Sequence, residues 1–336
     1  MSNPFLSAKS KPGHGTIHLA LLPPTLPKLK TVSYQYPLKV VAPAPVYTEA
    51  DDSRLVHTVY LLTYGGGLVA GDCIDLSVTI EATTRLVLLT QGSTKLFKAP
   101  SRGVVSKQRM NVQLEPHSAL CYLPDPVQPF QRSCFEQRQI YNITLPNHDA
   151  ASTGTGSLCA LDWVCNGRPA NGENWSFHHY ASRNEVHLQT PGGGRKLLLR
   201  DNILLDDCGS EATLAARMAG QATFGTLILY GPLFATLGHF FVDEFKQLPR
   251  IGGRKWDSGS ESGDEAVDSL TIWRTARQRR DATDGLLWSA ASVRGCVVVK
   301  FGARAVEDGK RWLRSMLSRE GSVVRECGER ALLCLK

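Results

Sequence analysis

The stretch Gly65-Gly66-Gly67-Leu68-Val69-Ala70-Gly71-Asp72 decides the fold of the first half of this 336-residue chain. It contains G-x-G-x-x-A, a dinucleotide-binding pattern that requires a strand before the glycines and a helix after them. Residues 55–62 are rich in β-branched and aromatic side chains and predict the strand. Residues 73–80 alternate apolar and polar with period two, which predicts a second strand instead of the helix. The pattern therefore indicates a turn between two strands and not a nucleotide site.

This turn uses glycine where the backbone adopts a positive φ. Gly66, Gly67 and Gly71 are its structural residues. Asp72 follows at the point where the backbone comes close to another group, which makes it the first candidate site residue.

Runs of β-forming residues continue from residue 16 to about 230. They are separated by turn residues, as in an all-β fold, and lie at 85–90, 104–114, 118–123, 133–145, 157–165, 184–188 and 196–205. No βαβ alternation occurs, which argues against a parallel α/β sheet. We find no internal repeat and no linker that splits the chain.

Helical spacing of apolar residues is found mainly late in the chain. It predicts helices at 233–247 and 304–318, with a buried strand at 295–301 between them. The fold class that we predict is mainly β, with many short strands in packed sheets forming a single elongated domain and two helices near the C-terminus. This domain spans 16–336 and follows a polar, disordered segment at 1–15.

Two loops stand out by composition and are predicted to be mobile inserts, at 147–156 and 252–268. The first is rich in Ser, Thr, Gly, Asn and Asp. The second contains the acidic Ser/Gly-rich run at 257–265.

Composition excludes several classes of protein. The net charge is +7, but no basic run carries interleaved aromatics, so nucleic acid binding gains no support and an acidic protein partner is favoured. There is no signal peptide and no apolar run of membrane-spanning length, which predicts a cytoplasmic protein. The nine cysteines include no C-x-x-C pair, so most are expected to be small buried hydrophobes.

The common catalytic motifs G-x-S-x-G, H-E-x-x-H and the P-loop are missing. Residues 91–95, which include Ser93 and Lys95, resemble a P-loop fragment but lack its upstream glycine, so a strand-ending turn is favoured. His178 and His179 are consecutive and would point to opposite faces of a strand, so they cannot chelate one ion together.

Three carboxylates lie in unusual surroundings. Asp162 interrupts the apolar run 158–165 and needs a cation, a hydrogen-bond network or a wet channel, and Arg168 is the nearby cation. Glu173 follows in a turn, and Asp201 follows the apolar run 197–199. For each of them a structural salt bridge is the competing interpretation.

Taken in order, several short motifs resemble the urease accessory protein UreD (UreH) family. They cover about residues 35–320 and read VYLL at 59–62, GGLVAGD at 66–72, QGSTKLF at 91–97, YLPDP at 122–126, PF at 129–130, DWVCNGRP at 162–169, GE at 172–173 and SRNEV at 182–186. Ala70 departs from the glycine usual in the family. The acidic insert suggests a eukaryotic, fungal-like member.

The resemblance implies a mainly β protein with no catalysis of its own. It further implies binding to apo-urease and to UreF, and through UreF to the GTPase UreG, with a homodimer in the complex left open. Together these proteins deliver nickel to the urease active site, and UreD is thought to supply an internal polar passage. No permanently bound cofactor is implied, and nickel is bound only in transit.

A passage gives the carboxylates a common physical reason. Ni²⁺ accepts oxygen and nitrogen ligands, and scattered single oxygens release an ion more readily than a closed cage does. We therefore predict that Asp72, Asp162, Glu173 and Asp201 line one cavity, with Ser93, Lys95 and Arg168 beside it. Two alternatives stay open: a β-rich hydrolase that uses Asp162 and Glu173 as an acid–base pair, and a pure scaffold without a metal path.

Overall fold

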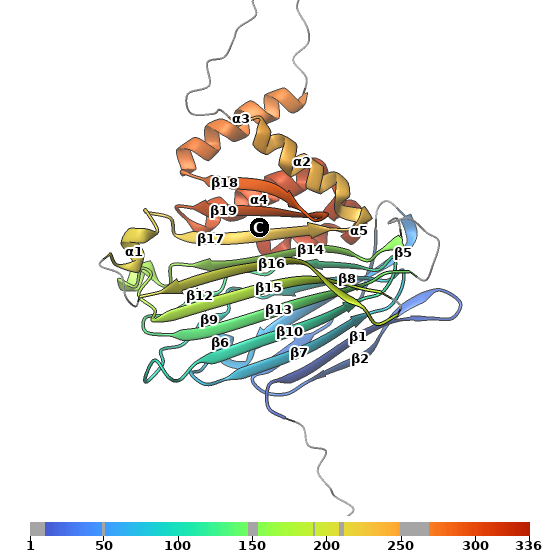
Figure 1. The fold of residues 1–336 in the computed structure, drawn as a ribbon, viewed down its shortest axis with the longest axis horizontal. Coiled ribbons are helices and arrows are strands. Elements are labelled where there is room, and N and C mark those ends of the chain that lie inside the picture. Colours follow the sequence, from blue (N-terminus) through green and yellow to red (C-terminus); the bar gives the residue numbers. More distant parts are fainter. Residues whose placement is uncertain (1–10, 49–50, 147–153, 191, 208–211, 249–268) are drawn as a thin grey trace, which may run out of the picture.

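Two large sheets lie face to face, and helices cover the outer face of one of them (Figure 1). The computed structural model describes residues 11–48, 51–146, 154–190, 192–207, 212–248 and 269–336. Strands predominate in this single domain, which confirms the mainly β prediction.

The strands form three sheets. In spatial order, the first sheet contains β16 (Arg195–Asp206), β15 (His179–Gln189), β13 (Cys134–Thr144), β10 (Ser106–Leu114), β7 (Cys73–Ile80), β1 (His14–Leu22) and β2 (Leu26–Tyr34). The second sheet contains β18 (Leu287–Val293), β19 (Cys296–Ala303), β17 (Thr223–Tyr230), β14 (Ser157–Cys165), β11 (Ala119–Tyr122), β8 (Arg85–Thr90), β5 (Asp51–Thr63) and β3 (Leu38–Val41), with β4 (Val46–Thr48) on β5. The small third sheet contains β12 (Gln128–Pro129), β9 (Lys95–Leu96) and β6 (Gly67–Leu68).

The chain visits these sheets in a repeating order and forms a solenoid. One coil runs from β5 through β6 to β7, the next from β8 through β9 to β10, and the third from β11 through β12 to β13. Equivalent strands of successive coils pair in parallel, so that Val56, Arg85, Ala119 and Ser157 lie side by side in the second sheet. Each coil thus buries its inner face against its neighbours.

This parallel pairing occurs in a mainly β fold, in agreement with the expectation that argued against a parallel α/β sheet. Parallel strands need a long crossover, which is usually a helix. Here the strands of the opposite sheet provide the crossover. The coils also constitute a structural repeat that we did not predict, because their side chains and lengths vary from coil to coil.

The glycine-rich turn joins two strands, as predicted. A short 3-10 turn, η1 (Tyr64–Gly66), leads from β5 into β6, and a tight turn then leads into β7. Gly66 and Gly71 have φ of 74° and 88°, the left-handed region that favours glycine. Gly67 is extended but lies against the next coil, where an added Cβ would sit 2.4 Å from the Lys95 carbonyl oxygen.

Both predicted C-terminal helices are confirmed, as α2 (Ala235–Lys246) and α4 (Val306–Glu320). Their apolar stripes pack on the outer face of the second sheet and form a separate core that includes Trp163, Phe241 and Trp312. The shorter helical segments are α1 (Leu214–Arg217) and α5 (Ser322–Cys327), with the 3-10 turns η3 (Pro169–Asn171), η4 (Pro232–Phe234) and η5 (Glu329–Leu335).

A third long helix, α3 (Ser269–Asp284), was not predicted. It lacks a clear apolar stripe and packs on α2 through ion pairs and a contact between the rings of Trp273 and Phe240. Arg274 and Arg277 both donate to the buried Glu244 carboxylate, at 2.6 and 3.0 Å. Apolar periodicity cannot reveal a helix that is held in this way.

The chain ends and inserts fall partly outside the described residues. Strand β1 begins at His14, so the expected disordered segment at 1–15 is too long at its end, because Gly15 packs against Leu38 and Leu76. Of the rest of that segment, residues 1–10 lie outside the described residues. So do most of the 147–156 insert and all of the 252–268 insert.

We predict that Gly67→Ala destabilises the solenoid by roughly 1–3 kcal/mol, as expected when a group is forced into a packed site. The backbone oxygen of Lys95 cannot move away without breaking the pairing of β6 with β9. The matched control is Gly192→Ala, where an added Cβ meets nothing within 4 Å. The measurement is the free energy of unfolding of both variants and the wild type, obtained from urea titrations. Equal stability of the two variants would contradict the close approach.

Candidate functional site

Polar side chains form a continuous group in the interior, between the two large sheets. We call this group the polar band. Its members come from β10, β13, β14, β15, β16, β17 and β19 and are Gln108, Gln137, Asp162, Ser182, Asn184, Asp201, Thr226 and Lys300. On β14, Asp162 alternates with the inward-facing Ala160 and Val164 of the main core, which places its carboxylate inside.

The Asp162 carboxylate is the centre of the polar band. Its side chain accepts hydrogen bonds from Gln137 Nε2 at 3.1 Å, Ser182 Oγ at 2.5 Å and Asn184 Nδ2 at 2.6 Å. Among the described residues, no Lys, Arg or His forms an ion pair with it. The residue is 4% exposed. A buried carboxyl held only by neutral donors is costly in its charged form.

Burial accordingly raises the pKa of Asp162 above its ordinary value. The hydrogen bonds from Ser182 and Asn184 oppose this shift because they favour the anion. The nearby negative charge of Asp201 adds to the shift. The same closeness is seen in the geometry, since Asn184 donates to Asp162 and is the register partner of Asp201.

Asp201 lies beside Asp162 in the polar band. Its strand neighbour is Asn184, which also donates to Asp162. Its Oδ1 accepts from Lys300 Nζ at 2.6 Å, and Lys300 also reaches Thr226 Oγ1 at 3.3 Å. Its Oδ2 is buried and has no hydrogen-bond partner among the described residues. An unpaired buried carboxylate oxygen is costly and leaves a ligand position open.

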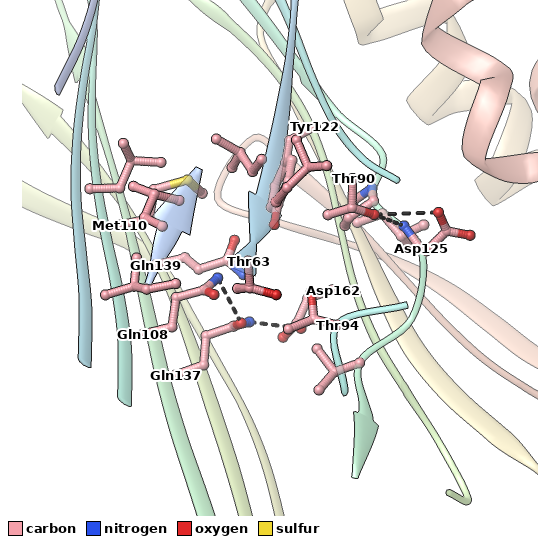
Figure 2. Close-up of a pocket in the computed structure, with 18 of the residues that line it drawn as sticks. Thr63, Thr90, Thr94, Gln108, Met110, Tyr122, Asp125, Gln137, Gln139 and Asp162 are labelled. Carbon is pink, nitrogen blue, oxygen red and sulfur yellow. Dashed lines mark hydrogen bonds between the residues drawn. The ribbon is translucent and has the colours of Figure 1, made fainter. Parts of the chain in front are cut away.

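A cavity of about 40 Å³ is lined in part by Asp162 (Figure 2). It is larger than the ~10–15 Å³ that one water molecule needs. Polar residues that line it include Gln108, Gln137, Gln139, Asp125 and Asp162. Asp125 is held by Lys310 Nζ of α4 at 2.9 Å and by the Gly92 N–H at 3.0 Å. Asp125 and Asp162 thus line one cavity, and Asn184 joins Asp162 to the strand position of Asp201.

Two of the four predicted carboxylates, Asp162 and Asp201, therefore come together. Asp72 does not join them. Its Oδ2 accepts from Val69 N–H at 2.8 Å and closes the turn before β7. Ser93 and Lys95 are not among the residues that line the cavity, and Lys95 is exposed.

Glu173 and Arg168 pair with each other instead. Arg168 Nε donates to Glu173 at 2.9 Å, and the Arg168 guanidinium lies 3.7 Å from the centre of the Phe130 ring. The hydrogen bond from Arg168 lowers the pKa of Glu173. Glu173 is not among the residues that line the cavity. It therefore behaves as the structural salt bridge that was the competing interpretation, and Arg168 is not the counter-ion of Asp162.

Several members of the polar band were missed in the sequence. Gln137 with Gln139, and Ser182 with Asn184, are polar residues at every second position of two strands, which is the spacing of one face. That signal is visible in the sequence. Which face is the interior depends on strand pairing that the sequence does not reveal.

Histidines and cysteines take no part in the polar band. His178 and His179 pair with Asp207 and Asp206, at 3.2 and 2.9 Å. The described cysteines are free thiols, and all but Cys73 are buried. Within the described ranges no three His, Cys, Asp or Glu side chains come together in a way that could hold a metal ion. The site therefore lacks the features of a storage cage.

Comparison with known proteins places the chain among urease accessory proteins. The family model described as "UreD urease accessory protein" matches residues 14–331. "Urease accessory protein 4" of Cryptococcus neoformans var. grubii is 30% identical over 348 aligned positions, which cover 94% of this chain and 93% of that protein. An "Uncharacterized urease accessory protein ureD-like" of Schizosaccharomyces pombe is 29% identical, with 84% and 86% covered. "Urease accessory protein D" of Arabidopsis thaliana is 33% identical, with 59% and 61% covered.

The chain belongs to the UreD family, which confirms the resemblance drawn from the ordered motifs. Members of this family are accessory proteins in urease maturation and not enzymes. None of the helices in the described part of the chain has the length and apolar character needed to cross a membrane.

We predict that Asp162→Asn becomes progressively more stable than the wild type as the pH rises. The raised pKa means that the folded state holds the proton of Asp162 more tightly than the unfolded state does. The resulting stability is complete below the ordinary Asp pKa of about 3.9 and is lost as the pH rises through the folded-state pKa. The amide keeps the shape of the side chain and has no charge to bury.

The measurement is the difference in the free energy of unfolding between variant and wild type, from about pH 4 to pH 8. Using the difference cancels the other titrating groups. A difference that does not change with pH would contradict a raised pKa.

Proposed function

We propose that this chain is a maturation scaffold that binds apo-urease and UreF, and through UreF the GTPase UreG, and that nickel passes through its polar band. The proposal joins the family membership to the interior chemistry. Its accessory role follows from the family, and the metal path rests on the geometry of Asp125, Asp162 and Asp201.

The observation that carries the metal path is the open ligand position beside Asp162. Asp162 lacks a cationic partner among the described residues, and Asp201 Oδ2 has no hydrogen-bond partner there. A divalent cation in the polar band would offset both costs. Oxygen ligands and amide groups suit Ni²⁺ in transit, because such scattered ligands bind it without a closed cage.

Lys310 and Lys300 hold Asp125 and Asp201, the two ends of this path, in the absence of metal. The ion pair of each lysine with its carboxylate must break before an ion can pass. Lys300 is 37% exposed in its side chain and can turn toward solvent, which keeps the cost of opening that end low. Nickel is the cargo in this proposal, and no resident cofactor is required.

The proposal includes a cytoplasmic location, which the free thiols of the described cysteines support, since such thiols persist in a reducing compartment. A homodimer within the complex is part of the same proposal. No feature of the described residues favours nucleic acid or membrane as a partner.

The experiment is reconstitution of apo-urease with UreF, UreG, GTP, bicarbonate, nickel and variants of this chain. We predict that Asp162→Asn combined with Asp201→Asn still binds UreF and urease but yields urease with several-fold less nickel, as expected when ligands to a cation are removed. Nickel per urease active site is measured by mass spectrometry. The matched control is Asp243→Asn on the surface of α2, which should load fully.

The variant Glu173→Gln tests whether Glu173 belongs to the metal path, as the sequence predicted, or lies outside it, as its position in the structure indicates. From the structure we expect this variant to load urease fully with nickel, because Glu173 pairs with Arg168 away from the polar band. Full loading by the Asp162/Asp201 variant, with complexes intact, would exclude the passage and leave the pure scaffold. Turnover of glycoside substrates by the isolated chain would instead favour the hydrolase.

A further inference from the structure

Three arginines lie side by side on the outer face of the first sheet. Arg109 of β10 is the register partner of Arg138 of β13, and Arg138 is the partner of Arg183 of β15. The row ends at Asp75 on one side and at Asn202 on the other. We call Arg109, Arg138 and Arg183 the arginine row. In Figure 1 no helix lies over these strands, whereas helices cover the second sheet.

Like charges placed directly opposite each other on neighbouring strands destabilise a sheet. Within the described residues, Arg138 is the member of the row that forms an ion pair, with Glu185 at 2.9 Å, whereas Asp75 lies opposite Arg109 without pairing with it. Arg183 donates to the neutral Asn202 Oδ1 at 3.1 Å. Neither Arg109 nor Arg183 forms an ion pair with a carboxylate of the described residues. The row therefore holds more positive charge than its surroundings neutralise.

A groove runs along this face, with a volume of about 590 Å³. Its walls include the arginine row, Lys107 and, at one side, Leu204 of β16. Leu204 is 67% exposed, so a large apolar side chain stands beside the charged row. Arginine and an exposed apolar anchor together are typical of protein interfaces.

We propose that this groove docks an acidic segment of a partner protein, with carboxylates on Arg109 and Arg183 and an apolar residue against Leu204. The guanidinium group forms two parallel hydrogen bonds with a carboxylate, which suits a row of arginines to an acidic segment. This inference rests on the proposed function in one respect, because the partner protein is expected to be one of the proteins of urease maturation.

Two other occupants fit less well. The net charge of +7 opposes the approach of a second copy of this chain to the row as a whole, although its own run 257–265 is acidic. Self-association of the isolated chain that is lost in the arginine-row variants would assign the groove to a second copy and overturn the inference of a different partner protein. A nucleic acid would bring its phosphates next to Glu136 and Glu185, which lie on the same strands. Glu136 already pairs with Lys107 at 3.3 Å, so the basic groups do not form an uninterrupted track for a phosphate backbone.

The test measures the affinity of the full chain for the purified UreF–UreG complex and, separately, for purified apo-urease, at low and at physiological salt. We expect Arg109→Glu combined with Arg183→Glu to weaken binding to one of these two proteins at least about tenfold, and to flatten the salt dependence of that binding. Arg109→Ala combined with Arg183→Ala should show a smaller loss in the same direction. It also serves as a second variant, should the charge reversal perturb the sheet.

The control is Arg279→Glu combined with Arg280→Glu, which makes the same change of charge on the exposed face of α3. It should bind both proteins as the wild type does. Unchanged binding of both proteins by both arginine-row variants would overturn this inference alone. So would a loss confined to added probes, either duplex DNA or vesicles of phosphatidylserine and phosphatidylcholine. A wild-type chain that binds neither protein would overturn the proposed function as well.

Discussion

The in-register stacking of parallel coils is the constraint on which the rest of the structure depends. Each strand of a coil pairs with the same strand of the next coil, so side chains at equivalent positions form rows that run along the solenoid. A row inside the solenoid is shielded from water, and a row outside is open to a partner. The polar band and the arginine row are the inner and outer results of the same geometry. Within such rows a polar side chain must be satisfied by its neighbours in adjacent coils.

The strand runs named from the sequence fall on observed strands, because alternation and turn residues are local signals. The run 184–188 covers only part of β15, and β18 was not predicted. Strand pairing could not be predicted. The run 73–80 is the same strand in an antiparallel or in a parallel sheet, and only the crossover by way of the opposite sheet decides between them. Helices α2 and α4 were predictable from their apolar stripes. Helix α3 was not, because its contact with α2 combines ion pairs with the aromatic contact of Trp273 and Phe240 and leaves no apolar stripe in the sequence.

The same division applies to the site. Asp162 was recognisable because a charge inside an apolar run must be compensated. Its compensation was not, because Gln137, Ser182 and Asn184 come from two strands that are distant in sequence and meet only in the folded solenoid. Glu173 was grouped with Asp162 on the strength of its neighbours in sequence. Its own turn provides a nearer cation in Arg168, and a local ion pair is easier to form than a distant one.

The lysines at the two ends of the polar path have a consequence for the order of folding. Lys300 and Lys310 lie near the C-terminal end of the chain, on β19 and α4, whereas Asp125 and Asp201 are made much earlier. During synthesis the N-terminal coils can stack before either lysine has left the ribosome. The nascent solenoid then contains carboxylates without counter-ions until the C-terminal layer docks. Completion of the chain thus supplies counter-ions to Asp125 and Asp201, while Asp162 keeps only its neutral hydrogen-bond donors.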